Sequence, residues 1–164
     1  MKTKIVVDSS SNLYTLSGVD FACVPLKIVT DDGEYLDTAE LDAVGMAQTL
    51  RSYKGKTGTS CPNVADWLAA YEGAEEVFVV TITGTLSGSY NAACVGREMV
   101  LERSPEKKIH IFDSESASAG ETLIALMLRD RIDGGHSFED IVAEMTAFIA
   151  RMKTRFVLED LSNL

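Results

Sequence analysis

The segment Glu76–Tyr90, EVFVVTITGTLSGSY, passes from an apolar run into a stretch of hydroxyls and glycines before helix-forming residues resume. The pattern predicts a strand over Glu76–Ile82 that is buried on both faces, followed by a helix over Ser89–Arg103. A buried strand, a polar loop and a helix in this order are typical of a parallel sheet that helices cover. The segment therefore predicts an α/β fold, and it raises the question of what its hydroxyls and bare amides do.

Outward from this segment, apolar runs alternate with helical patterns along the whole chain. Further strands are predicted at Lys4–Val7, Phe21–Thr30 and Lys108–Phe112, and a last strand is an option at Thr154–Leu158. Further helices are predicted at Asp42–Arg51, Asn63–Tyr71, Ser118–Arg131 and along the apolar stripe from Phe138 to Met152. Pro25 should place its strand at an edge or a bend. The expected fold of residues 1–164 is one α/β domain, with a mostly parallel sheet and helices on both faces.

The composition disfavours several classes of protein. The chain has 164 residues and a formal net charge of -10, which opposes binding to nucleic acid or to anionic lipid headgroups. No segment approaches the apolar run of about 20 residues that spans a membrane, and no secretory leader is recognisable. The three cysteines, Cys23, Cys61 and Cys94, are widely spaced and are expected to be reduced thiols. We therefore expect a cytoplasmic protein without stable membrane insertion.

Hydroxyl side chains gather where the predicted strands end. The clusters are Ser9–Ser11, Thr83–Ser89 and Ser114–Ser118, and a fourth, Thr57–Asn63, stands just before a helix. Ligands of parallel sheets bind outside the carboxyl ends of the strands, and helix N-termini there favour an anion. Serine and threonine are also ordinary helix caps, worth about 1 kcal/mol each, so a purely structural role is the alternative for any single cluster. Together the four clusters predict an uncharged anion cradle.

The sequence carries no recognisable catalytic or metal-binding motif. It contains no phosphate-binding G-x-x-x-x-G-K-[ST] loop, no G-x-G-x-x-G after a strand, no G-x-S-x-G elbow and no H-E-x-x-H. His110 is expected in a strand and His136 in a solvated loop. Asp8 and Asp113 end two strands that we expect to be neighbours, where they form either an acid/base pair or simple caps. We therefore expect a protein with no metal, no cofactor and no catalysis of its own.

Five motifs in order along the chain resemble the DegV family. They are Val7–Ser11, Val24-Pro25-Leu26, Thr59-Ser60-Cys61-Pro62, Leu86–Ala93 and Phe112–Gly120. The resemblance spans nearly the whole chain, although Cys61, Asn63 and Ser89 depart from the commoner family wording. It implies a bacterial fatty-acid-binding protein. Such a protein holds a free long-chain fatty acid and presents its carboxylate to a separate ATP-dependent fatty acid kinase subunit.

The resemblance also assigns residues to the headgroup site. The carboxylate-binding hydroxyls fall on Thr59 and Ser87. The supporting residues expected around them are Ser60, Gly88, Ser89, Ser9, Ser10 and Ser114. The family's second half, which adds an arginine and a histidine to the site, is expected to be absent from this chain, which would be an N-terminal domain alone.

Two further expectations follow from these readings. If a second domain normally covers the acyl chain, the apolar helix that carries Leu123, Ile124, Leu126, Met127 and Leu128 should be uncovered here. The chain could then self-associate through that face. A rival function, an α/β enzyme that acts on a small phosphorylated or carboxylated metabolite, stays open at this point.

Overall fold

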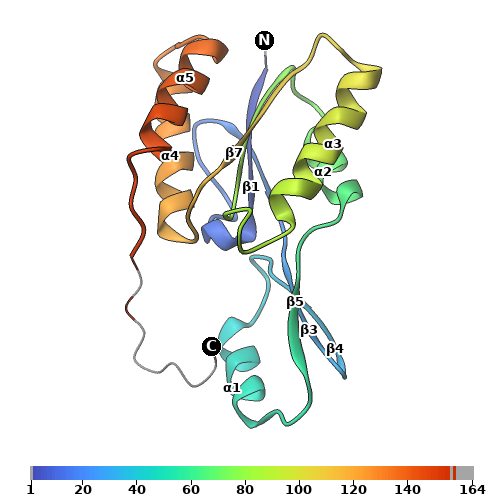
Figure 1. Cartoon of the computed structure of the whole chain (residues 1–164). Helices are drawn as coiled ribbons and strands as arrows, with labels where there is room; N and C mark the ends of the chain where they lie inside the picture. The colour runs from blue at the N-terminus through green and yellow to red at the C-terminus, as the bar shows by residue number, and fades with distance from the viewer. Residues whose placement is uncertain (1, 156, 158–164) are drawn as a thin grey trace.

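A computed structural model of the chain describes residues 2–155 and 157, and its centre is a parallel sheet (Figure 1). The four strands are β1 (Thr3–Asp8), β2 (Asp20–Val24), β6 (Glu76–Thr81) and β7 (Lys108–Asp113). Their spatial order is β2-β1-β6-β7, and every neighbouring pair is parallel. The α/β class and the parallel sheet predicted from the sequence are confirmed.

Helices cover both faces of this sheet. One face packs against α2 (Val64–Ala70) and α3 (Ser89–Arg103), and the other against α4 (Ala119–Asp133) and α5 (Phe138–Ile149). Successive strand residues point to opposite faces, and because helices cover both faces, the residues on both must be apolar. On β1, Ile5 and Val7 face α4 and α5, whereas Val6 faces α2 and α3. This explains the unbroken apolar runs in the sequence.

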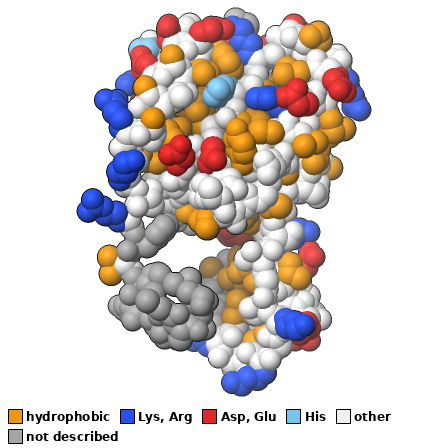
Figure 2. Space-filling view, in the orientation of Figure 1, with side chains coloured by type: hydrophobic (Ala, Val, Ile, Leu, Met, Phe, Trp, Pro, Cys, Tyr) orange, Lys and Arg blue, Asp and Glu red, His pale blue; other side chains and the backbone are white. Residues whose placement is uncertain are grey.

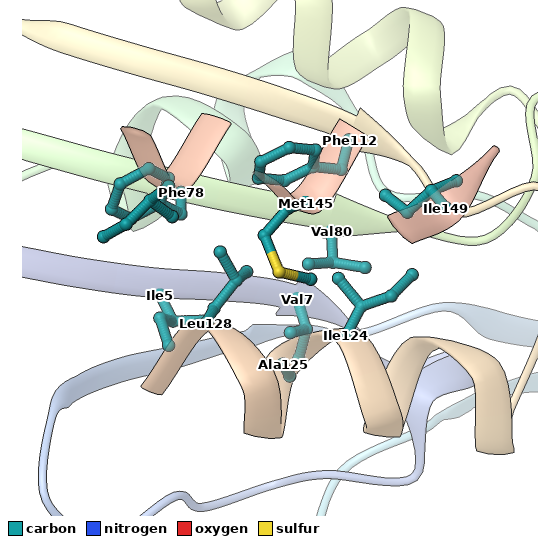
Figure 3. Close-up of a cluster of buried hydrophobic side chains, with 11 residues drawn as sticks. Ile5, Val7, Phe78, Val80, Phe112, Ile124, Ala125, Leu128, Met145 and Ile149 are labelled. Carbon is teal, nitrogen blue, oxygen red and sulfur yellow. The ribbon is translucent and has the colours of Figure 1, made fainter. Parts of the chain in front are cut away.

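The larger of the two cores lies between the sheet and the α4–α5 pair (Figure 3). Phe78 and Phe112 from adjacent strands stack there with ring centroids 6.4 Å apart. Ile124 and Leu128 of α4 and Met145 of α5 are completely buried against them. The expectation that α4 presents an uncovered apolar surface is therefore largely wrong, because these core contacts use its apolar face. Leu123 alone among its large side chains is exposed, at 44%.

A second, smaller sheet lies at the carboxyl end of the first, where the chain leaves β2 (Figure 1). It is antiparallel, has the order β4-β3-β5, and is accompanied by α1 (Ala43–Ser52). Its strands are β3 (Lys27–Thr30), β4 (Gly33–Leu36) and β5 (Thr57–Ser60). No residue of β3, β4, β5 or α1 is fully buried. This sheet therefore has no closed core within the part of the chain that the structure describes.

The second sheet corrects two sequence predictions. The strand expected over Phe21–Thr30 is divided at Pro25, because proline cannot donate a ladder hydrogen bond, and its halves belong to different sheets. Thr57–Ser60, for which the sequence predicted no strand and only a place before a helix, is a strand that pairs with β3. At the other end of the chain, Thr154, Arg155 and Val157 are not in a strand, while residues 156 and 158 lie outside the described residues. None of the described helices combines the length and the apolar character needed to cross a bilayer.

Candidate functional site

The turn between β6 and α3, residues 82–89, is held in shape by its own backbone. The amides of Leu86 and Ser87 donate to the carbonyl oxygen of Thr83 at 3.0 and 3.3 Å. The amide of Ser89 donates to the Ser87 hydroxyl oxygen at 3.2 Å. Ser87 is half-buried, and its own hydroxyl proton has no acceptor among the residues that the structure describes. That proton is therefore available to an incoming oxygen. We call residues 82–89 the Ser87 turn.

The helix that follows this turn begins without a side-chain cap. Gly88 is the N-cap residue of α3 and is exposed. By contrast, α2 and α4 are each closed by a complete capping box, Asn63 with Asp66 and Ser118 with Glu121. The N-terminus of a helix carries unpaired amides and the positive end of its dipole, and it favours an anion. At α3 the N-cap residue has no side chain to fill this place, and Ser87, whose hydroxyl oxygen accepts from the amide of Ser89, keeps its proton for another acceptor.

A contact with Gly88 brings the segment after β5 to the same place. A Cβ atom on Gly88 would lie 3.1 Å from the Sγ atom of Cys61. Thr59, two residues before Cys61, is exposed on β5 opposite Ile28 of β3. No hydrogen bond of the Thr59 side chain is found within the described residues, whereas the Ser60 hydroxyl donates to the carbonyl oxygen of Cys61 at 3.3 Å. The segments that carry Thr59 and Ser87 therefore meet at the Cys61–Gly88 contact.

Other predicted site residues lie beneath this surface and serve the backbone. The Ser9 hydroxyl oxygen accepts from the amide of Leu26 at 3.0 Å, which fixes the chain as it leaves the main sheet. The Ser114 hydroxyl donates to the carbonyl oxygen of Ser116 at 3.0 Å and accepts from its amide at 3.1 Å. Both serines are fully buried. Ser9 and Ser114 therefore bond to the backbone, which is the structural role that the sequence left open as the alternative to ligand binding.

Asp8 and Asp113 anchor turns at different points of the sheet edge. β6 lies between their strands, so the expectation that they end neighbouring strands is wrong. Asp113 accepts from the amides of Gly84, at 3.2 Å to each carboxylate oxygen, and of Glu115, at 3.1 Å. These bonds fix the backbone of two turns and do not cap a helix, because the next helix, α4, begins only at Ala119.

Glu121, which the sequence reasoning missed, is completely buried below the edge. It occupies the third position of the α4 capping box, and Ser118, three residues earlier, was the signal that could have identified it. The Ser10 hydroxyl lies 2.5 Å from its Oε1 atom and 2.7 Å from Oδ1 of Asp8. Burial first, and then the negative charge of Asp8, raises the pKa of Glu121 to about 9. A neutral carboxylic acid is therefore built into the edge of the sheet.

The described residues contain no group of three or more His, Cys, Asp or Glu side chains arranged to hold a metal ion. The cysteine side chains are free thiols, all of them half-buried. The edge of the sheet thus offers hydroxyls, amides and a helix terminus. This donor set suits a small anionic oxygen group.

Comparison with known proteins identifies the family. The model of the DegV family, described as uncharacterised proteins, matches residues 2–164. The chain belongs to the DegV family. A DegV domain-containing protein of Streptococcus pneumoniae is 40% identical over 168 residues, which cover 100% of this chain and 60% of that protein.

Solved structures of DegV proteins share the fold. The Fatty Acid Kinase (Fak) B3 protein of Streptococcus pneumoniae, loaded with linoleic acid, has a TM-score of 0.89 and 40% identity, covering 92% of this chain and 55% of that one. A DegV family protein of Eubacterium eligens, loaded with heptadecanoic acid, has a TM-score of 0.88 and 36% identity, covering 91% and 54%. The chain therefore spans a little over half the length of the DegV proteins that it matches.

Proposed function

We propose that this chain binds a long-chain fatty acid, with the carboxylate at the Ser87 turn and at Thr59. The hydroxyl proton of Ser87 carries the proposal, because it has no acceptor among the described residues and lies at the N-terminus of α3, where the N-cap residue Gly88 has no side chain. The DegV proteins of Streptococcus pneumoniae and Eubacterium eligens were solved with fatty acids bound. Gly88, Ser89 and Ser60 complete this surface, and Ser9, Ser10 and Ser114 support it from below.

The acyl tail belongs on the second sheet. Figure 2 shows hydrophobic side chains at the surface of this lower unit. Val44 of α1 is 69% exposed and Leu36 of β4 is 43% exposed. Leu86, in the Ser87 turn itself, is 68% exposed. A sheet with no closed core gains stability from any apolar group that covers it. An acyl chain that starts at Ser87 would supply such cover.

The two parts of the ligand contribute differently to the binding free energy. Burying a methylene contributes about 0.8 kcal/mol, so a dozen methylenes supply on the order of 10 kcal/mol before the costs of ordering. A hydrogen bond to a carboxylate adds only about 1.5 to 3 kcal/mol. The tail therefore supplies the affinity, and the hydroxyls fix which end of the ligand is held at the edge of the sheet. Presentation of that end to a separate kinase subunit is the role we propose, in keeping with the name of the Streptococcus pneumoniae relative.

Calorimetric titration with sodium oleate tests the headgroup assignment. Ser87→Ala and Thr59→Val should each weaken binding by roughly tenfold or more, the loss expected for one hydrogen bond to a charged group. Ser104→Ala, at the far end of α3, and Thr57→Val, two residues earlier on β5, are matched controls that should bind as the parent does. Methyl oleate has the same tail and no carboxylate, so its affinity should be the same for the parent protein and for all the variants.

Three results would overturn this assignment. Wild-type affinity for oleate in both the Ser87→Ala and Thr59→Val variants would remove these hydroxyls from the site. Turnover of a small phosphorylated or carboxylated metabolite by this chain alone, abolished by either substitution, would favour the rival enzyme function. Absence of both oleate binding and turnover would exclude both functions for this chain.

A further inference from the structure

Two completely buried carboxyl groups, Asp8 at the end of β1 and Glu121 in the first turn of α4, are joined through one hydroxyl. Ser10 lies 2.7 Å from Oδ1 of Asp8 and 2.5 Å from Oε1 of Glu121. A serine hydroxyl has a single proton, so it can donate to only one of these oxygens at a time. Because both contacts are of hydrogen-bond length, the second proton must come from a carboxyl group. We call Asp8 and Glu121 the acid pair.

The remaining contacts of the acid pair place that proton on Glu121. Oδ2 of Asp8 already accepts from the hydroxyl of Ser89 at 2.5 Å and from the amide of Ile82 at 3.0 Å. Oε2 of Glu121, equally buried, has no hydrogen-bond partner in the described part of the chain. Apart from Ser10, Glu121 receives a single donor, the amide of Ser118, which lies 3.1 Å from Oε1. A carboxylate that receives several donors is stabilised in its charged form more than a buried carboxyl that receives fewer and has one oxygen without a partner. Asp8 is therefore the acceptor and Glu121 the protonated acid.

The surroundings of the acid pair offer no cation that could replace the proton. Neither carboxyl forms an ion pair with Lys, Arg or His among residues 2–155 and 157. From β2 the titratable neighbour is Cys23, whose thiol pKa is raised to about 12 by burial, Asp8, Asp37 and Glu121. Asp113, at the end of β7, turns to the amide of Gly84. Two like charges in such a place would repel each other strongly, so one proton must be retained.

The carboxylate of Asp8, which lies next to the proton on Glu121, also fixes both ends of the Ser87 turn. Ile82 is the first residue of the turn and Ser89 the last, and both bond to Oδ2 of Asp8. Ser89 in turn donates its amide to the Ser87 hydroxyl oxygen. The path from Glu121 through Ser10, Asp8 and Ser89 to Ser87 is thus made of consecutive hydrogen bonds. A second charge on Glu121 would disturb Asp8 and, through it, the position of Ser87.

We propose that the acid pair holds one proton and that this proton keeps the Ser87 turn in the shape that receives a carboxylate. Asp8 and Glu121 are then positioning residues, which act on the ligand through Ser89 and Ser87. Loss of the proton at alkaline pH adds a buried negative charge next to an anion site. Ligand release at alkaline pH follows. The ligand part of this inference rests on the proposed function, whereas the shared proton and its effect on the turn do not.

A nuclear magnetic resonance titration of the whole chain without ligand tests the proton and the turn. The side-chain carboxyl carbon of Glu121 should titrate with a midpoint near 9, and the amide signals of Gly88 and Ser89 should shift with the same midpoint. In Glu121→Gln, which is neutral at every pH, the two amide signals should not titrate in this range. Glu98→Gln, at an exposed position on α3, is the matched control and should titrate as wild type does. A Glu121 midpoint near the ordinary value, or amide signals that titrate equally in Glu121→Gln, would overturn the proposal.

Binding of sodium oleate at two pH values tests the coupling to the ligand. A monomeric fatty acid stays ionised from about pH 7 to about pH 10, so a change in affinity reports on the protein. Wild-type affinity should fall roughly tenfold over this range, and that of Glu121→Gln should stay constant. Equal pH dependence in both would overturn the coupling. If wild type fails to bind oleate at either pH, the proposed function fails, while the ligand-free titration still decides whether the acid pair positions the turn.

Discussion

The Sγ atom of Cys61 lies 3.1 Å from the place that a Cβ atom would take on Gly88. These residues are far apart in the sequence and belong to different layers, since Cys61 follows the small antiparallel sheet and Gly88 opens a helix of the main one. A glycine at position 88 lets the two segments approach, and the approach brings the Thr59 strand to the Ser87 turn. The geometry of the candidate site depends on this contact.

Substitution of Gly88 should therefore impair the site more than the fold. The backbone of Gly88 is in the right-handed helical region, so Gly88→Ala introduces no backbone strain, but its methyl group must push Cys61 aside by a few tenths of an ångström. We expect a small loss of stability, about 1 kcal/mol or less, and severalfold weaker oleate binding. The measurements are chemical denaturation and calorimetry.

A second substitution distinguishes the Cys61 contact from a general effect. Cys61→Ala shortens the opposing side chain, so the double variant Cys61→Ala/Gly88→Ala should recover most of the affinity that Gly88→Ala loses. Additive losses in the double variant would show that the Cys61–Gly88 approach does not control the site.

Alkylation of Cys61 should report on ligand binding. Cys61 is half-buried beside the Ser87 turn, and an acyl chain that starts there should shield its thiol. Oleate should slow the reaction of Cys61 with iodoacetamide severalfold, as measured by peptide mass spectrometry. Cys94, on α3 and packed against the core between that helix and the sheet, is the internal control and should react at the same rate with and without oleate. If Cys61 reacts with iodoacetamide at the same rate with saturating oleate as without it, the ligand lies elsewhere.

The buried Glu121 should make the stability of the protein depend on pH. Its pKa is about 9 in the folded state and close to 4.5 once exposed, so between these values the folded state binds the extra proton. The free energy of unfolding must therefore fall as pH rises through this window and then level off, by on the order of a few kcal/mol. Glu121→Gln should lack this decline. Parallel stability curves for the two proteins between about pH 5 and about pH 9 would show that Glu121 is not protonated in the fold.

The two faces of α4 should respond differently to truncation. Leu128 is completely buried against β1 and α5, so Leu128→Ala should cost about 2 to 5 kcal/mol. Leu123, on the same helix, is 44% exposed, and Leu123→Ala should cost about 0.5 kcal/mol or less. The midpoints of urea denaturation give both values. Equal effects would contradict the burial of α4 in the core.

Much of the main sheet could be predicted from local sequence. Apolar runs such as Val77–Val80 must be buried on both faces, and capping residues such as Asn63 and Ser137 mark where helices begin. The predicted range Ser89–Arg103 is the observed α3. These features are local because burial of consecutive strand residues and capping of helix ends depend on neighbours in the chain.

The second sheet and the candidate site could not be predicted in this way. A strand such as Thr57–Ser60 has no apolar alternation, and only its pairing with β3 holds it extended. Nothing in the spacing of the sequence indicates that Cys61 touches Gly88 or that Glu121 shares a hydroxyl with Asp8.

The sequence by itself determined the alternation of strands and helices, the hydroxyl-rich strand ends and the resemblance to the DegV family. The tertiary structure decided which hydroxyls are open to a ligand, because Ser9 and Ser114 are fully buried, whereas Ser87 is half-buried and its proton has no acceptor in the described part of the chain. It also decided the charge state of Glu121, since burial beside Asp8 depends on elements more than a hundred residues apart. Hydrogen-bond partners and the local dielectric constant are set only when the chain has folded. They decide which of the many serines, threonines and acidic residues form the candidate site.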